Sequence, residues 1–218
     1  MFTKLPKWVE YGAFTLAVIA GVINAVGLLG FQHQAISHLS GTVTLFGTQV
    51  VTNLNGSLYL AMIVFSFVVG SAISGFLLSG GSLKLGRHYD SLLLIEGCLL
   101  IISAYLLSHS YYYGIYFASM ACGLQNALAT TYSGAVIRTT HLTGIFTDLG
   151  IMLGKVLKGD TFDHRKCVMF LVIIMGFVSG GVIGQYLFSL YNVSALYFPA
   201  VTCLMLASTY RGYRLLSK

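Results

Sequence analysis

Two short polar motifs contain the residues best suited to chemistry in this chain, "HLSG" at 38–41 and "HLTG" at 141–144. The imidazoles of His38 and His141 can donate or accept a hydrogen bond and titrate near neutral pH, so they can bind a polar solute or carry a proton. Nearby hydroxyl groups can replace the water around a solute, and the glycine of each motif lets a ligand or a backbone come close. The motifs therefore predict a solute-binding site formed by His38, Ser40, Gly41, Thr44, His141, Thr143, Gly144 and Thr147.

The same residues also allow a structural interpretation, in which they cap and pack helices and each histidine ties a loop to neighbouring carbonyls. Two histidines without a set of carboxylates or cysteines make a weak metal-ligand group, so no metal or other cofactor is predicted. No nucleophile elbow, HExxH motif or repeated carboxylate pair occurs, and an enzyme is therefore not expected. Acidic and basic residues are mixed in "KVLKGDTFDHRK" at 155–166, which indicates a solvated face and not a nucleic-acid interface.

Further polar side chains lie within apolar segments. Asn24 and Asn126 occupy matched positions, where an amide can bind an irregular backbone or the solute. Charges inside a membrane are costly and are usually paired or functional, so Asp148 and Arg138 are expected either to pair with each other or to handle an ion or a proton. Glu96 is a third carboxylate within an apolar segment and is a candidate proton relay.

The composition indicates an integral membrane protein, because 56% of the 218 residues are hydrophobic and only 8% are charged, with a mean hydropathy of +0.83. A crossing helix needs roughly 20 apolar residues. Such segments are expected at 11–30, 58–79, 91–108, 112–131, 167–187 and 195–209. The two polar motifs begin shorter segments rich in Gly and Thr, 39–53 and 142–157, which are short and polar for lipid-facing helices.

The basic residues favour six crossings over eight. If both short segments enter and leave by the same face, all 12 Lys and Arg lie on one side, which is cytoplasmic by the positive-inside rule. If both short segments cross, Lys84, Arg87 and Arg138 lie outside. We therefore expect six transmembrane helices, two re-entrant segments, and cytoplasmic N- and C-termini.

Three sequence blocks recur in the same order, which predicts a duplicated unit. They are "AGVINAV" (20–26) with "CGLQNAL" (122–128), "SHLSGTVTLFG" (37–47) with "THLTGIFTDLG" (140–150), and "FVVGSAIS" (67–74) with "FVSGGVIG" (177–184). The first repeat covers 1–109 with its re-entrant segment at 31–53, and the second covers 110–218 with its re-entrant segment at 132–157. Because each repeat has an odd number of crossings, the second is expected to be inverted relative to the first, as in many transporters.

The fold class that follows is an all-α integral membrane protein with six transmembrane helices and two re-entrant half-helices, arranged as an inverted repeat. Ser37 or Ser40 is expected to cap the first half-helix, and Thr140, His141 and Thr143 begin the second. The two N-termini then meet near the middle of the membrane, where their unpaired N–H groups and dipoles favour an anionic or electron-rich polar ligand.

Two motifs in this order, Gly-x-x-[Asn/Asp]-Ala and His-[Leu/Met]-[Ser/Thr]-Gly, resemble those of the YoaK-like family of bacterial multi-span membrane proteins, a domain-of-unknown-function family. In this chain they are "GVINA" at 21–25 and "HLSG" at 38–41. The resemblance covers most of the chain. It implies a multi-pass protein of the bacterial inner (cytoplasmic) membrane and supplies no established substrate.

The expected function is that of a small transporter in the lipid bilayer, which moves a small molecule or ion through a site between the two motifs. Coupling to protons is one option for its mechanism. A channel-like pore and a non-transporting membrane scaffold or sensor are the alternatives. Ridges of small residues, such as Gly176, Gly180 and Gly184, are expected to join the two halves within one chain, with a homodimer as the second interpretation.

Overall fold

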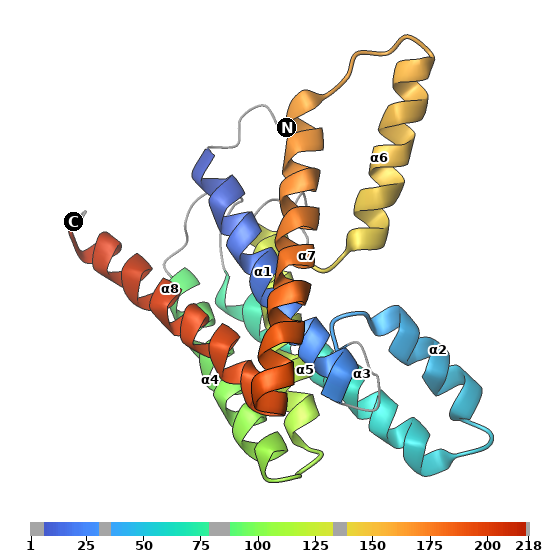
Figure 1. The fold of residues 1–218 in the computed structure, drawn as a ribbon, viewed down its shortest axis with the longest axis vertical. Helices are drawn as coiled ribbons and strands as arrows, with labels where there is room; N and C mark the ends of the chain where they lie inside the picture. Colours follow the sequence, from blue (N-terminus) through green and yellow to red (C-terminus); the bar gives the residue numbers. More distant parts are fainter. Residues whose placement is uncertain (1–6, 31–35, 79–87, 133–138, 217–218) are drawn as a thin grey trace.

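A computed structural model describes residues 7–30, 36–78, 88–132 and 139–216. All regular elements within these ranges are helical, which confirms the predicted all-α class. In chain order they are α1 (Lys7–Gly30), α2 (Leu39–Gln49), α3 (Leu54–Leu77), α4 (Tyr89–Ser108), α5 (Gly114–Tyr132), α6 (Leu142–Leu157), α7 (His164–Tyr191), the 3₁₀ turn η2 (Asn192–Leu196) and α8 (Tyr197–Leu216). Figure 1 shows their arrangement, with the start of α1 and the end of α8 toward the same end of the molecule.

Four stretches of the described chain are long and apolar enough to cross a membrane. They are Glu10–Gly30, Leu54–Leu77, Tyr89–Ser108 and the continuous stretch His164–Leu216, which contains α7, η2 and α8. Their most apolar windows have mean hydropathies between 2.0 and 2.4. The helices therefore have the length and composition of a membrane protein, whereas the finer count of six crossings stays a prediction.

Helix α5 was expected to be a span at 112–131, but it is not among these stretches. It lies against α1, α3 and α4, and two of its polar side chains bind backbone carbonyls of α3 and α1. Ser119 Oγ donates to the Ile63 carbonyl at 2.8 Å, and Gln125 Nε2 donates to the Leu16 carbonyl at 3.3 Å. A helix enclosed by protein can contain polar residues that a lipid-facing helix excludes, which explains its low hydropathy.

The closest helix crossings occur twice, at equivalent positions of the two repeats. Where α1 crosses α7, a β-carbon on Gly21 would overlap the Phe177 carbonyl oxygen. Where α5 crosses α3, a β-carbon on Gly123 would overlap the Phe67 carbonyl oxygen. Gly21 and Gly123 occupy the same place in the first sequence block, and Phe67 and Phe177 occupy the same place in the third.

The other side of each crossing matches as well. A β-carbon on Gly180 of α7 would overlap the Val18 carbonyl oxygen, and one on Gly70 of α3 would overlap that of Met120. Val18 and Met120 precede the two matched glycines of α1 and α5 by the same spacing. The helix with the first sequence block of each half of the chain therefore packs against the helix with the third block of the other half, so that the two halves are interlocked.

Helices α2 and α6 lie at the periphery and are short. At about 1.5 Å per residue, the 11 residues of α2 and the 16 of α6 rise roughly 16 and 24 Å, less than the ~30 Å of a hydrocarbon core. Thr42 is the buried residue of α2 and Ile145 that of α6. Neither helix alone is long enough to cross, as expected for these segments, and their re-entrant path stays a prediction.

Candidate functional site

The two polar motifs lie at the starts of α2 and α6. In Figure 1 both helices begin beside the middle of α7 and run toward opposite ends of the molecule. His38 and His141 are close enough for their charges to interact. Phe177 of α7 links the two starts, because its ring makes an edge contact with His38 at 5.8 Å between centroids and packs on the apolar cluster that contains Ile145 of α6. The structure thus brings the two predicted halves of the site together.

In the first copy, the start of α2 is fastened to α1 by Asn24. The Asn24 Oδ1 atom accepts hydrogen bonds from Ser37 Oγ at 2.9 Å and from the Ser37 backbone N–H at 3.4 Å. The His38 Nδ1 atom lies 3.4 Å from both Asn24 Oδ1 and Ser37 Oγ. Asn24 and Ser37 are buried, whereas His38 is half-buried. Asn24 therefore positions His38 beside α1, and the ring retains part of its exposure.

The second copy has the same backbone plan but different hydrogen bonds. The His141 side chain is exposed, and its ring lies over the first turn of α6, where a β-carbon on Gly144 would overlap Nδ1. Asn126 Oδ1 and Thr139 Oγ1 are buried, and neither has a hydrogen-bond partner among the described residues. Unsatisfied buried polar atoms are costly. The second copy is therefore less completely satisfied than the first.

The predicted N-cap of α2, Ser37 or Ser40, was wrong, whereas His141 was among the residues predicted to begin α6. The N-cap residues are His38 and His141, and within the described chain neither side chain makes a capping hydrogen bond. Ser37 precedes the N-cap residue and its hydroxyl donates to Asn24, whereas Ser40 lies inside the first turn of α2. The first N–H groups of a helix have no partner within the helix, so two uncapped helix starts are exposed to any polar molecule between them.

The predicted hydroxyl groups fall into two classes. Thr44 Oγ1 donates to the Ser40 carbonyl at 2.8 Å, and Thr147 Oγ1 donates to the Thr143 carbonyl at 2.9 Å. Because their protons are used within the helix, Thr44 and Thr147 present only acceptor lone pairs to a ligand. The hydroxyls of Ser40 and Thr143 make no hydrogen bond within the described residues and can donate to an anion.

The predicted glycines also differ between the copies. Gly41 is exposed, and a β-carbon built on it would meet no atom within 4 Å. No described backbone lies near Gly41, and the close approach of a ligand there stays a prediction. At Gly144 a β-carbon would overlap the imidazole of His141, so a glycine is needed there. Steric fit therefore explains the glycine in the second copy, whereas in the first copy the glycine leaves open space beside the start of α2.

Asp148 makes a salt bridge with Lys166 of α7, with 3.2 Å between Oδ2 and Nζ. Its predicted partner, Arg138, lies outside the described residues. The Asp148 side chain is 46% exposed, and Lys166 also lies over the Phe170 ring at 5.3 Å. Lys166 was missed as a partner because the sequence placed it in a basic loop. Asp148 therefore helps to hold α6 against α7, in addition to any role with an ion.

Glu96 is not part of the assembled motifs. Its side chain is fully buried in α4, and neither carboxyl oxygen has a hydrogen-bond partner within the described part of the chain. Its polar neighbours are the thiols of Cys203 on α8 and Cys122 on α5. A partnerless ionised carboxylate is costly in such a place. Glu96 is therefore a buried acid separate from the two motifs, and its role as a proton relay stays a prediction.

Phe177 is a contact residue of the motifs that sequence reasoning missed. It lies within a repeated block, and the identity of Phe67 and Phe177 was an available signal. The described residues contain no group of three or more His, Cys, Asp or Glu side chains that could hold a metal ion.

A family model described as "Protein of unknown function (DUF1275)" matches residues 12–209, which include both motifs, α2 to α7 and most of α1 and α8. The expected membership of a family of unknown function is thereby confirmed. No curated protein and no solved structure matches the chain.

Proposed function

The chain belongs to this family of proteins of unknown function, and we propose that it is a small membrane transporter for an anionic or polar solute. The observation that carries the proposal is the meeting of two uncapped helix starts, each with a histidine at its N-cap position. Positive dipole ends and unpaired N–H groups attract negative charge, and the Ser40 and Thr143 hydroxyls add donors at both starts. A solute between the helices would contact equivalent groups from both repeats.

We further propose that the repeats are inverted. The matched glycine crossings of α1 with α7 and of α5 with α3 support a two-fold relation between them. The opposite directions of α2 and α6 along the bundle support an axis in the membrane plane, because an axis along the membrane normal would leave equivalent helices running the same way. In this arrangement one motif is reached from each side of the membrane.

The interlocked packing affects which parts move in alternating access. Rocking of one sequence half against the other would break both glycine crossings, which are among the closest contacts of the bundle. The crossings instead favour two mixed bodies, α1 with α7 and α3 with α5. The motifs lie between these bodies, since α2 packs on α3 while the cluster around Ile145 of α6 includes residues of α1 and α7. Relative rotation of the two bodies would expose the solute to one side at a time.

The test is solute flux into proteoliposomes with the full chain. Radiolabelled formate, acetate, nitrate, phosphate, glycerol and urea serve as probes, with protein-free vesicles as the baseline. We expect uptake of at least one probe above baseline and its loss in the His38→Ala/His141→Ala double variant. His164→Ala is the matched control, because His164 is an exposed histidine at the start of α7 that contacts Phe162 instead of either motif.

Thermal melting separates loss of function from loss of structure. The double variant must melt as cooperatively as the wild type for its flux to be interpreted. A wild-type chain that carries none of the probes, or a folded double variant with undiminished flux, would contradict the central site. The first of these outcomes favours a membrane scaffold or sensor.

A further inference from the structure

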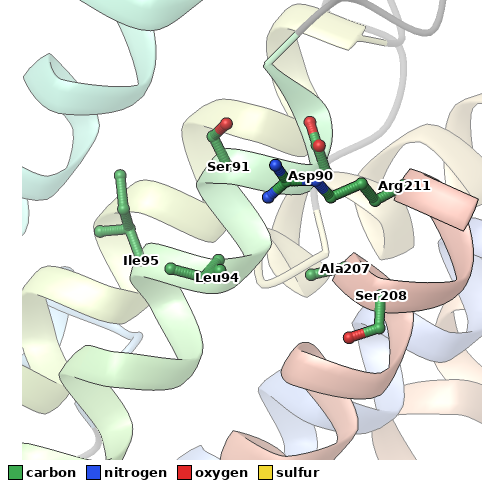
Figure 2. Close-up of a pocket in the computed structure, with 7 residues that line it drawn as sticks. All are labelled: Asp90, Ser91, Leu94, Ile95, Ala207, Ser208 and Arg211. Atoms are coloured by element: carbon green, nitrogen blue, oxygen red, sulfur yellow. The ribbon is translucent and has the colours of Figure 1, made fainter. Parts of the chain in front are cut away.

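A pocket of about 340 Å³ lies between the beginning of α4 and the end of α8, away from the histidine motifs. Figure 2 shows its lining residues, with Asp90, Ser91 and Arg211 at one end and Leu94 and Ile95 about one turn farther along α4. Ala207 and Ser208 of α8 complete the wall. One wall belongs to the first repeat and the other to the second.

The charge of the pocket is set by Arg211. Asp90 is buried, and its two carboxylate oxygens each lie 3.3 Å from a guanidinium nitrogen of Arg214, which neutralises it. Arg211 is exposed, and it has no ion pair with any described residue. The pocket therefore presents one uncompensated positive charge beside a bound ion pair.

The hydroxyl groups have complementary capacities. Ser208 Oγ donates to the Leu204 carbonyl at 2.8 Å, so it can only accept a further hydrogen bond. Ser91 is exposed and makes no hydrogen bond within the described residues, so it can donate. A phosphodiester oxygen can accept from Ser91 and Arg211, and a hydroxyl on the same headgroup can donate to Ser208.

The position of the pocket identifies the source of such a headgroup. The apolar span of α4 begins at Tyr89, so the pocket lies where that helix reaches the edge of the hydrocarbon region. Tyr89 contacts Tyr210 with 5.2 Å between ring centroids, and Tyr213 is exposed nearby on α8, as in the aromatic belt at a membrane interface. Leu94 is 45% exposed and offers an apolar surface directly below the polar end.

We propose that this pocket binds an anionic phospholipid, with the phosphodiester at Arg211 and Ser91 and the first acyl methylenes against Leu94 and Ile95. Basic pockets between membrane helices are suited to anionic headgroups. Because α4 and α8 form opposite walls, the lipid also links the two repeats at this end of the bundle. The proposal depends on the membrane location of the chain and not on transport.

Native mass spectrometry of the full chain in detergent tests the site, with phosphatidylglycerol titrated against phosphatidylcholine of the same acyl chains. We expect phosphatidylglycerol to bind more tightly, and Arg211→Gln to weaken it about fivefold, the effect of one basic residue near an anionic surface. Lys158→Gln is the control, because it removes an exposed cation at the end of α6. Ser208→Leu fills the pocket without changing the charge and is expected to weaken binding as well.

The remaining outcomes have defined meanings. Equal affinity for the two lipids, or an Arg211→Gln variant that binds phosphatidylglycerol as the wild type does, would overturn the proposal. Inorganic phosphate or glycerol 3-phosphate that binds as tightly as the lipid, with the same loss in Arg211→Gln, would also overturn it, because the site would then serve a soluble phosphate. If Arg211→Gln fails to melt cooperatively, Ser208→Leu decides between these results.

Discussion

Alanine at Gly70 or Gly180 should destabilise the bundle, although alanine is the better helix former. A new β-carbon on Gly70 would lie 2.8 Å from the Met120 carbonyl carbon, and one on Gly180 would lie 2.9 Å from the Val18 carbonyl carbon. Heavy atoms in contact prefer about 3.5–4.0 Å, so each helix pair must separate by roughly 1 Å. The obstructing atoms are backbone, which cannot move aside by a change of rotamer.

The size of this destabilisation can be estimated by comparison with unobstructed glycines of the same two helices. Gly75 of α3 and Gly181 of α7 have no atom within 4 Å of a built β-carbon, so alanine there should gain about 0.5–1 kcal/mol of helix propensity. Gly70→Ala and Gly180→Ala make the same gain and lose about 1–3 kcal/mol through overpacking. The difference between test and control variants is therefore about 1–3 kcal/mol, because the propensity terms cancel.

Thermal melting of the full chain in one detergent measures this difference. At about 2–4 °C for each kcal/mol, the test variants should melt several degrees below their controls. The two test variants should also behave alike, since their positions are equivalent in the two repeats. If Gly70→Ala and Gly180→Ala melt with their controls, the close crossings do not exist. If only one of the two is destabilised, the reciprocal packing of the repeats is wrong.

Three further changes test other contacts of the structure. Asn24→Ala should lower the free energy of unfolding by about 1–3 kcal/mol, because it leaves the buried Ser37 hydroxyl without its acceptor. An unchanged melting temperature would refute the Asn24 contact with the start of α2. Asp148→Asn should change the free energy of unfolding by less than about 1 kcal/mol at any salt concentration, because the ion pair of Asp148 with Lys166 is solvent-exposed. A larger loss would mean that the carboxylate has a further partner. Glu96→Met should raise the melting temperature, because an apolar side chain of similar size then replaces a buried carboxyl that lacks partners within the described chain. A lower melting temperature would show that the carboxyl is hydrogen-bonded in the folded protein.

The repeated blocks allowed much of the packing to be anticipated from the sequence. The ridge of Gly176, Gly180 and Gly184 predicted close helix contacts between the halves, and the structure has such contacts with α1 at all three. Helical class and membrane-like composition followed from hydropathy alone. The enclosure of α5 could not be predicted from its hydropathy, because it depends on which helices surround α5, and that is a property of the assembled bundle.

The hydrogen-bond and ion-pair partners at the site depend on which helices lie side by side, and a linear sequence does not reveal this. Ser37 has the usual chemistry of an N-cap, but α2 begins one residue later than such a cap requires, and the Ser37 hydroxyl binds Asn24 of α1. The partner of Asp148 depended on α7 passing beside α6, which brought Lys166 within 3.2 Å. The sequence pattern also predicted one common role for Gly41 and Gly144, whereas in the structure only Gly144 lies against an imidazole, that of His141.

The crossing of α1 with α7 also determines the order in which the protein can be completed during synthesis. Residues 31–163 are made between these helices, which takes on the order of 10 s at roughly 5–20 residues per second. Throughout that interval the face of α1 that holds Gly21 has no permanent neighbour and must be covered by lipid or by the insertion machinery. Neither repeat made alone would contain the helix against which its first helix packs, so the two halves are products of one folding event.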